Sequence, residues 1–358
     1  MKLVQASVEV REIPLRTTFR TALRSTSSVT DIRVRLETDE GLVGWGSASP
    51  TPAITGETEG SIVYAIERHL FPVLEASDLD DEHAVLAAIQ RAIVRNTAAK
   101  AAVDIALHDL YAKRAGLPLW RRTGSQPGAI ETDATVSLNR VEAMIDEARD
   151  YCAKGFKVLK VKLGGRDGLD MERLFGIRSS VDEEIQLRVD ANQAWSAKEA
   201  IGYLATMEKL CVDYLEQPVP AWDLAGLAAV AQASSLPVVA DESVFGMTDL
   251  LKVIDQRAAD IVNLKLMKTG GITIALQMVQ TIRAAGLDWM VGSMMEGPIS
   301  VTAAAILAAS QGCRHVDLDA GMFLGDHPLQ GGISYEGPRI VLPSGEGVGI
   351  DGDRRGSG

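Results

Sequence analysis

Residues 157–163 read KVLKVKL, and the rest of the chain can be interpreted outward from them. Apolar residues alternate with lysines here, which is typical of a β-strand whose side chains point to opposite faces in turn. Lys160 and Lys162 therefore share one face of the predicted strand. Because two neighbouring ammonium groups repel each other and are costly to bury, the stretch predicts a site in which acidic groups surround them.

Acidic residues follow at regular intervals, each at the end of a short apolar run. Starting from Lys162, the residues Asp190, Glu216 and Asp241 follow at steps of 28, 26 and 25 residues. Each step is the length of one strand, one helix and two loops. The spacing therefore predicts repeated strand–helix units that bring these side chains to the same edge of a sheet.

Eight short apolar runs after residue 132 are predicted strands, with helical patterns between them. They occupy residues 134–138, 158–163, 187–189, 214–215, 238–240, 261–266, 290–291 and 316–318. Regular alternation of this kind favours a parallel sheet, and eight strands closed on themselves form a TIM-type (β/α)₈ barrel. An open doubly wound sheet is the alternative. We prefer the barrel because no glycine-rich phosphate loop follows the first strand.

The first 120 residues have a different pattern, typical of an α+β domain. Strands are predicted at residues 1–14, 32–37 and 42–46, and helices at residues 61–74 and 81–116. The segment 16–30 is rich in serine and threonine without clear periodicity, so we expect a loop there. The second helical pattern has a break near Asn96.

The chain is therefore expected to form two domains. The barrel domain is predicted at residues 121–324, and an α+β capping domain at residues 1–120. Two further β segments, at residues 331–335 and 339–342, are expected to return to the capping domain, so that residues 325–358 complete it. A length of 358 residues agrees with about two domains.

Composition excludes several classes of protein. The net charge of −12 argues against binding to nucleic acid or to an anionic membrane surface, because both require clustered lysine and arginine. Three scattered cysteines indicate a reducing compartment. The N-terminus lacks a signal-peptide core, and the apolar runs are too short to span a bilayer. We expect a cytoplasmic, homo-oligomeric protein that acts on a small molecule.

Three carboxylates at the ends of neighbouring strands predict a metal site. Asp190, Glu216 and Asp241 would meet on one rim, where the reactive groups of a parallel barrel lie. Oxygen ligands of this kind suit Mg²⁺. The alternative for each residue is a helix cap or a solvated loop position, and the pattern does not separate Asp241 from Glu242.

Lysines on two strands predict a pair of bases. Lys265 is on the sixth predicted strand, across the barrel from the second strand with Lys160 and Lys162. We expect neighbouring cations and partial desolvation to lower a lysine pKa toward the range of a general base. The alternative is that Lys265 forms an ion pair with an acid of the barrel. Lys268 is expected to lie in a loop or at the start of a helix.

Polar groups are also expected at the ends of the last two strands. Asp317 and Asp319 share a face of the eighth strand and suit an ammonium group of a ligand. Pairing with Lys265 or Arg314 is the alternative. Glu296, near the end of the seventh strand, is expected beside the pocket.

Together these residues resemble the enolase superfamily, in its muconate-lactonizing subgroup, and most of all its dipeptide epimerases of the L-Ala-D/L-Glu type. The motifs that carry the resemblance are Lys160-Val161-Lys162, Asp190-Ala191-Asn192, Glu216-Gln217-Pro218, Asp241-Glu242-Ser243, Lys265 and Asp317-Leu318-Asp319. The resemblance covers essentially the whole chain and implies a modified (β/α)₇β barrel with a capping domain. One departure is Gly297-Pro298-Ile299-Ser300, where a loop with lysine or threonine is more usual.

The resemblance also implies roles for individual residues. Mg²⁺ would be held by the three predicted metal ligands, Lys162 and Lys265 would be the two bases, and Lys160 would offset negative charge on the substrate. Asp317 and Asp319 would bind the α-ammonium of a dipeptide. Contacts to the rest of the dipeptide are implied for Arg24, which would meet a side-chain carboxylate, and for Thr135, Ser293 and Glu296.

The implied activity is epimerisation of the C-terminal residue of a dipeptide by proton transfer through an enolate. An o-succinylbenzoate synthase or a muconate cycloisomerase on the same scaffold is the alternative. Neither of those reactions would give Asp317 and Asp319 a cation to bind. A non-catalytic barrel that binds a metal or a peptide is a third possibility.

Overall fold

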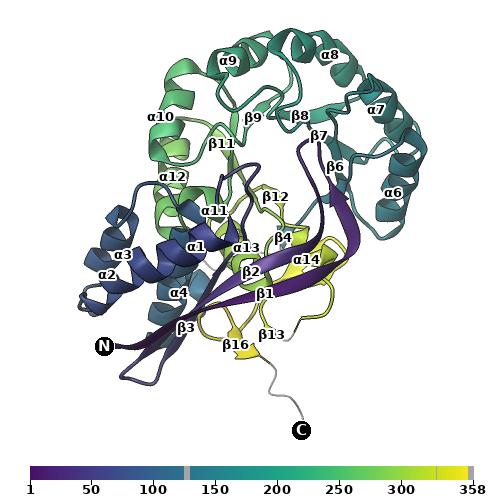
Figure 1. Ribbon diagram of the computed structural model, residues 1–358. Helices are drawn as coiled ribbons and strands as arrows, with labels where there is room; N and C mark the ends of the chain where they lie inside the picture. Colours follow the sequence, from purple (N-terminus) through teal and green to yellow (C-terminus); the bar gives the residue numbers. More distant parts are fainter. Residues whose placement is uncertain (125–129, 328, 354–358) are drawn as a thin grey trace.

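The strand that carries the lysine pair is β6 (Val158–Lys162), and it belongs to an eight-stranded parallel sheet (Figure 1). The other strands are β5 (Ala134–Val136), β7 (Gln186–Asp190), β8 (Val212–Glu216), β9 (Val238–Ala240), β10 (Ile261–Leu264), β11 (Asp288–Gly292) and β12 (His315–Asp317). This is a computed structural model, and it describes residues 1–124, 130–327 and 329–353. No helix in these three segments is long and apolar enough to cross a membrane.

The sheet closes into a barrel. Its strands pair in sequence order from β5 to β12, and the ends meet where the Asp133 amide donates to the Val316 carbonyl at 3.2 Å. A doubly wound sheet instead reverses its strand order at a switch point. The predicted barrel is therefore confirmed, and the open-sheet alternative is wrong. Almost all the strand residues are buried, as expected when both faces of a parallel sheet are covered.

Helices surround the barrel and connect its strands (Figure 1). They are α6 (Val141–Ala153), α7 (Asp170–Arg178), α8 (Ala197–Lys209), α9 (Leu224–Ala233), α10 (Met247–Gln256), α11 (Leu266–Thr269), α12 (Ile272–Ala284), α13 (Pro298–Ser310) and α14 (Ala320–Phe323). Local sequence explains where several of them begin. For α8, Ser196 and Glu199 form a reciprocal capping box. For α13, Pro298 occupies the first turn, where its missing N–H is not needed.

The N-terminal domain combines an antiparallel sheet with helices. Its elements are β1 (Leu3–Arg20), β2 (Ser25–Thr38), β3 (Val43–Ala48), α1 (Glu59–Ala65), the π-helix η1 (Ile66–Leu70), α2 (Phe71–Glu75), α3 (Glu82–Arg91), α4 (Thr97–Arg114) and α5 (Leu119–Thr123). The backbone of α4 passes so close to β3 that a Cβ on Gly44 or Gly46 would collide with the helix carbonyls of Ala106 or Ala102. Glycine at these positions therefore allows the helix to lie directly on the sheet.

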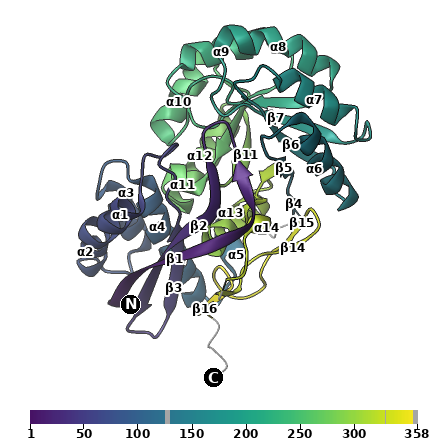
Figure 2. The same ribbon diagram turned by 45° about the vertical axis from the view of Figure 1, so that its right-hand side comes forward.

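The expectation of a loop at residues 16–30 is wrong, because β1 and β2 continue through it as one long hairpin (Figure 2). The pairing extends to Arg20 opposite Ser25, and the Thr21 amide closes the turn on the Arg24 carbonyl at 2.9 Å. Apolar side chains of the hairpin pack on the barrel. This second apolar cluster consists of Ile13, Phe19, Val29, Met295, Val301, Ala320, Phe323 and Leu324. Tertiary packing thus makes strands of a segment whose own pattern is weak. We call residues 3–38 the capping hairpin.

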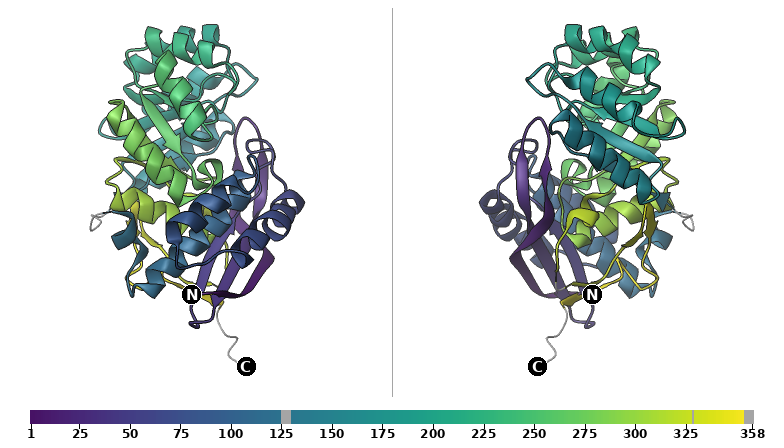
Figure 3. Two further views of the ribbon diagram at one scale, coloured as in Figure 1. Left: turned by 90° about the vertical axis from the view of Figure 1, so that its left-hand side faces the viewer. Right: turned by 90° about the vertical axis from the view of Figure 1, so that its right-hand side faces the viewer.

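Buried aspartates of α4 join the two domains. Asp104 accepts hydrogen bonds from the amides of Ile272 at 2.6 Å and Thr273 at 3.1 Å, and so caps the N-terminus of the barrel helix α12. Asp109 accepts from the amides of Trp45 at 2.8 Å and Val348 at 2.7 Å. The N-terminal domain is therefore anchored beside the barrel, with the capping hairpin reaching across its mouth (Figure 3).

The C-terminal β segments pair differently from what we expected. Strand β14 (Ser334–Glu336) pairs with β15 (Arg339–Val341), and β15 pairs with β4 (Ile130–Glu131) rather than with the sheet β1–β2–β3. Strand β13 (Leu329–Gly331) pairs with β16 (Ile350–Asp353). Contact with the N-terminal domain is made instead around residues 347–350, for example by the Leu119 amide to the Gly347 carbonyl at 2.8 Å. The domain boundaries stay a prediction, and residues 354–358 lie outside the described residues.

Candidate active site

An inner cavity lies between the carboxyl ends of the barrel strands and the tip of the capping hairpin. It encloses about 40 Å³. Seven predicted site residues line it, namely Arg24, Thr135, Lys162, Lys265, Ser293, Asp317 and Asp319. Beneath them, Lys160 and the three predicted metal ligands are completely buried. The structure therefore brings together residues that are up to 295 positions apart, from Arg24 to Asp319.

Lys160 is held by three carboxylates. Its Nζ lies 2.6 Å from Asp317, 2.7 Å from Glu216 and 3.1 Å from Asp190, and the side chain is 0% exposed. Burial acts to lower the pKa of Lys160, but attraction to these carboxylates outweighs it and holds the pKa well above its ordinary value. Lys160 is therefore a fixed positive charge at the bottom of the cavity.

Lys162 and Lys265 enter the inner cavity from opposite walls. Strands β6 and β10 are separated by three strands in either direction around the barrel. Lys162 Nζ lies 2.6 Å from Asp190, and Lys265 Nζ lies 2.8 Å from Asp241. The alternative that Lys265 pairs with a barrel acid is thus observed. Burial lowers the pKa of Lys265, but Asp241 outweighs it, so the pKa is raised rather than lowered as we expected.

Lys268 lies in the first turn of α11, so the expected helix start is confirmed, but its burial in the core of the site was not foreseen from the sequence. Its side chain is 0% exposed, and its Nζ donates to Asp241 Oδ1 at 2.5 Å and to the Asn263 carbonyl at 2.9 Å. Burial lowers the pKa of Lys268. The signal that could have revealed it is its spacing of three residues from Lys265, which places both lysines around one helical turn.

The three predicted metal ligands fit a hard cation in donor chemistry. Burial, reinforced by the charges of Asp190 and Asp241, raises the pKa of Glu216 to about 6 despite the opposing effect of Lys160. Lys160 pairs with Glu216 Oε2, and Asn263 Nδ2 donates to Glu216 Oε1 at 2.7 Å. A divalent cation would relieve the repulsion among the three carboxylates, and carboxylate oxygens are the preferred ligands of such a cation.

Ammonium groups lie among these carboxylates in the structure. In the described part of the chain, no group of three or more acidic, histidine or cysteine side chains is arranged to hold a metal ion as it stands. Lys160 instead lies between Asp190 and Glu216, while Lys265 and Lys268 pair with Asp241. A bound cation would therefore share the oxygens of these carboxylates with the ammonium groups or compete with them.

Glu242 and Asp241 are neighbours in sequence but have different partners in the structure. Its Oε1 accepts from Asn192 Nδ2 at 3.2 Å, whereas Asp241 faces the two lysines. Burial, the charge of Asp241 and that of Asp190 raise the pKa of Glu242 to about 8. Asp241 is therefore better placed than Glu242 as the third metal ligand. The position of Glu242 next to Asp241 was the only sequence signal for it.

Asp317 and Asp319 lie at the end of β12 and face different partners. Asp317 is paired with Lys160, and Asp319 accepts from the Thr135 amide at 2.7 Å. Burial and the neighbouring Asp317 charge raise the pKa of Asp319 to about 6. Neither of the partners we considered, Lys265 and Arg314, forms an ion pair with them among the described residues. Both carboxylates thus line the inner cavity, and of the two only Asp317 forms an ion pair among the described residues.

The capping hairpin and the β11 loop complete the cavity. Arg24 at the hairpin tip is partly buried, and this burial lowers the pKa of its guanidinium. Attraction to Glu296 opposes the shift but does not outweigh it. Glu296 lies behind the wall at 1% exposure, where its Oε1 accepts from the Met294 amide at 2.7 Å. Burial raises the pKa of Glu296 to about 7. Ser293 contacts the cavity directly, whereas Glu296 does not line it.

The fold and this ring of lysines and carboxylates define a class of protein. The chain belongs to the enolase superfamily, in the family of mandelate racemase and muconate lactonizing enzyme. Residues 3–124 match the family described as mandelate racemase/muconate lactonizing enzyme, N-terminal domain, and residues 143–356 match enolase C-terminal domain-like proteins. The predicted family is confirmed.

Within this family the chain is similar to dipeptide epimerases over nearly its whole length. It is 43% identical to the L-Ala-D/L-Glu epimerase of Clostridium acetobutylicum over 95% of this chain and 96% of that protein. A substrate-liganded complex of the L-Ala-D/L-Glu epimerase from Bacillus subtilis has a TM-score of 0.96 and 41% identity, covering 99% of both chains. The Enterococcus faecalis dipeptide epimerase complexed with Mg and L-Leu-L-Tyr has a TM-score of 0.93 and 36% identity, covering 98% of this chain and 99% of that chain.

Proposed function

We propose that this chain is a magnesium-dependent dipeptide epimerase that inverts the α-carbon of the C-terminal residue of its substrate. The observation that carries the proposal is the placement of Lys162 and Lys265, which project into one cavity from opposite walls. Inversion needs one proton-transfer group on each face of the carbon. The similarity to dipeptide epimerases over nearly the whole chain supports the same activity.

Lys162 removes the α-proton from one face, and Lys265 returns a proton to the other. Each lysine must be neutral when it accepts a proton. Lys162 contacts Asp190, and the contact of Lys265 with Asp241 favours the charged form of Lys265. Those same carboxylates are the proposed metal ligands. Asp241, which causes the raised pKa of Lys265, would be shared with the cation, and a weaker contact with Asp241 would make the neutral form of Lys265 easier to reach.

Asp190, Glu216 and Asp241 would hold Mg²⁺. When bound, the ion supplies electrostatic stabilisation for the negative charge that develops on the substrate carboxylate as the α-proton leaves. Lys160 adds a fixed positive charge from below, because three carboxylates keep it protonated. The inner cavity is closed by the capping hairpin, which excludes water from the reacting carbon.

The remaining residues orient the dipeptide. Asp317 and Asp319 accept its α-ammonium, and the contact between Asp319 and the Thr135 amide fixes the direction of that carboxylate. Arg24 meets a carboxylate on the second side chain, which favours glutamate there, and Ser293 contributes a hydroxyl to the wall. A cycloisomerase or o-succinylbenzoate synthase would leave the two aspartates without a cationic ligand group, which makes these alternatives weaker.

Location and assembly are further parts of the proposal. The thiols of Cys152, Cys211 and Cys313 are all free, which supports a reducing, cytoplasmic location. Exposed Trp222, at 83%, and Phe175, at 62%, support a homo-oligomer in which such side chains are covered. The molar mass in solution, from light scattering, tests the assembly.

The decisive experiment is α-proton exchange in D₂O. With Mg²⁺ and L-Ala-L-Glu, we expect inversion of the glutamyl residue and incorporation of one deuterium at its α-carbon. Lys162→Ala and Lys265→Ala should each lower the epimerisation rate by at least about 1,000-fold, since each removes a proton-transfer group.

The control is Lys252→Ala, which removes an exposed lysine far from the inner cavity and should retain full activity. Circular dichroism and Mg²⁺ titration verify that the variants fold and bind metal. Normal epimerisation by Lys265→Ala would contradict the two-base scheme, and absence of exchange with every dipeptide tested would contradict the function itself.

A further inference from the structure

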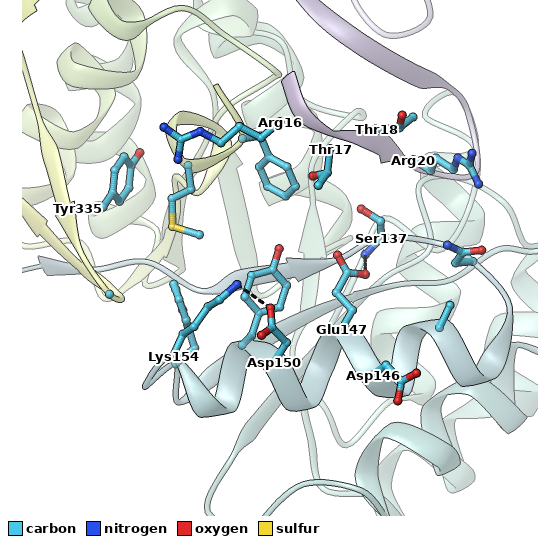
Figure 4. Close-up of a pocket in the computed structure, with 17 residues that line it drawn as sticks. Arg16, Thr17, Thr18, Arg20, Ser137, Asp146, Glu147, Asp150, Lys154 and Tyr335 are labelled. Carbon is cyan, nitrogen blue, oxygen red and sulfur yellow. Dashed lines mark hydrogen bonds and ion pairs between the residues drawn. The ribbon is translucent and has the colours of Figure 1, made fainter. Parts of the chain in front are cut away.

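A second, larger cavity of about 1050 Å³ lies outside the barrel, between β1, α6 and α14 (Figure 4). We call it the outer cavity. One wall is the end of β1, with Thr18 and Arg20, and the other is α6, with Glu147 and Tyr151. The two cavities lie on either side of one aromatic pair. Phe19 lines the inner cavity, Phe323 lines the outer one, and their rings contact edge to face at 5.6 Å.

Glu147 is a partly exposed carboxylate without an ion-pair partner among the described residues. Its Oε2 accepts from the Ser137 amide at 3.0 Å, and it forms no ion pair with any residue of the described segments. The nearby Lys154 is bound to Asp150 at 2.6 Å (Figure 4). Burial raises the pKa of Glu147 to about 7, and Asp319 contributes to the shift. A carboxylate that is partly removed from water gains from a positive partner, so Glu147 offers a place for a cationic group.

The hydroxyl of Ser137 beside it is also without a partner. Ser137 is 7% exposed and lines the outer cavity, and its Oγ forms no hydrogen bond within the described part of the chain. Figure 4 shows this hydroxyl above Glu147, on the side facing β1, while the guanidinium groups of Arg16 and Arg20 point away from the carboxylate. A donor placed here would satisfy both groups at once.

This polar pair is close to the amino end of the proposed substrate. Thr135, whose amide binds Asp319, is on β5, and Ser137 follows two residues later, directly after the end of that strand. Two residues of extended chain span about 7 Å. A lysine side chain has a flexible four-carbon stem of comparable reach. Its apolar stem would pass beside the ring of Phe323, which suits an amphipathic side chain.

We infer that Glu147 and Ser137 form a subsite for a cationic side chain on the amino-terminal residue of the dipeptide. The inference rests on the proposed function and extends it to the first residue of the substrate. With the α-ammonium at Asp317 and Asp319, the side chain of that residue lies next to the wall between the two cavities. A lysyl side chain then places its ammonium group between the Glu147 carboxylate and the Ser137 hydroxyl.

Paired substrates test this subsite. L-Lys-L-Glu and L-norleucyl-L-Glu have side chains of similar shape, and only the first carries a charge. We expect kcat/KM for deuterium exchange to favour the lysyl dipeptide by about 10- to 100-fold, the range for a charge-assisted hydrogen bond. Glu147→Gln, which keeps an acceptor for the Ser137 amide, should bring this ratio to about one.

The matched control is Glu142→Gln, the same substitution at an exposed position of α6 that does not line the outer cavity. It should keep both the ratio and the rates of the unmodified chain. A ratio of one in the unmodified chain, or an unchanged ratio in Glu147→Gln, would overturn the subsite while leaving the epimerase proposal intact. Lack of exchange with both dipeptides and with L-Ala-L-Glu would overturn the proposed function, and the subsite with it.

Discussion

The barrel rim and the tip of the capping hairpin face the same inner cavity, but they hold charge in different ways. On the rim, Lys160, Lys162 and Lys265 each have a buried carboxylate within 2.6 to 2.8 Å. At the hairpin tip, Arg24 has no ion pair with any residue in the described part of the chain, and burial lowers the pKa of its guanidinium. Charge on the rim is balanced internally, whereas the charge at the tip is left for a ligand.

This difference separates chemistry from selectivity. Side chains on buried strands are held by neighbours on both sides, so their geometry is precise and difficult to change. A hairpin tip packs on one side only and tolerates substitution more easily. We therefore expect substitutions on the rim to affect folding and turnover, and substitutions at the tip to affect the choice of substrate.

The largest effect is expected on the rim, at Lys268. Replacing this fully buried lysine with methionine keeps most of its volume but leaves Asp241 Oδ1 and the Asn263 carbonyl without this donor, while Lys265 still pairs with Asp241 Oδ2. Breaking a buried pair in this way should lower the free energy of unfolding by about 3 to 5 kcal/mol. Urea denaturation measures it, with exposed Lys252→Met as the matched control. A loss below that of the control would show that the rim does not depend on internal charge balance.

A smaller effect is expected at Glu296, where the rim meets the hairpin. Burial raises the pKa of Glu296 from 4.5 to about 7, so the folded chain binds its proton more tightly than the unfolded chain does. Stability is therefore lost as pH rises between these two values. Glu296→Gln should be more stable than the unmodified chain at pH 8 by up to about 3 kcal/mol, and equal to it near pH 4.5. Thermal unfolding at both pH values measures this difference. A stability gain that is the same at both pH values would contradict the raised pKa of Glu296.

The smallest effect on the enzyme as a whole is expected at the hairpin tip. Arg24→Met should lower kcat/KM for L-Ala-L-Glu by about 10- to 100-fold through loss of one charge-assisted contact. The rate with L-Ala-L-Gln, which lacks the side-chain carboxylate, should change much less. Arg20→Met at the neighbouring exposed position is the control. If Arg24→Met slowed both dipeptides equally, the tip would serve catalysis rather than selectivity, and the contrast with the rim would disappear.

Much of the barrel could be predicted because its strands have local signals. All eight predicted runs are strands, and the acids that follow them lie at one rim, since parallel strands share a direction. The break near Asn96 is also confirmed, between α3 and α4. By contrast, the strands at residues 16–30 have no alternating pattern and could not be predicted. Their extended form depends on pairing with each other and on packing of Phe19 against Phe323.

Partners of charged groups were the least predictable feature. Asp317 was expected to meet a ligand or one of two cations, and it pairs with Lys160 from a different strand. Lys268 was expected in a loop or at the start of a helix, with no sign of its contact with the buried Asp241. Such pairings depend on distances across the barrel, which sequence spacing does not encode.

The amino-acid sequence by itself determined the repeating strand–helix pattern, the identity of the family and the set of acids and lysines available to the site, because these depend on periodicity and residue type along the chain. The tertiary structure alone decided which ammonium faces which carboxylate, how far the hairpin reaches and which cavities form beside it. Those outcomes arise from contacts between segments that are distant in sequence, where packing and charge balance act together.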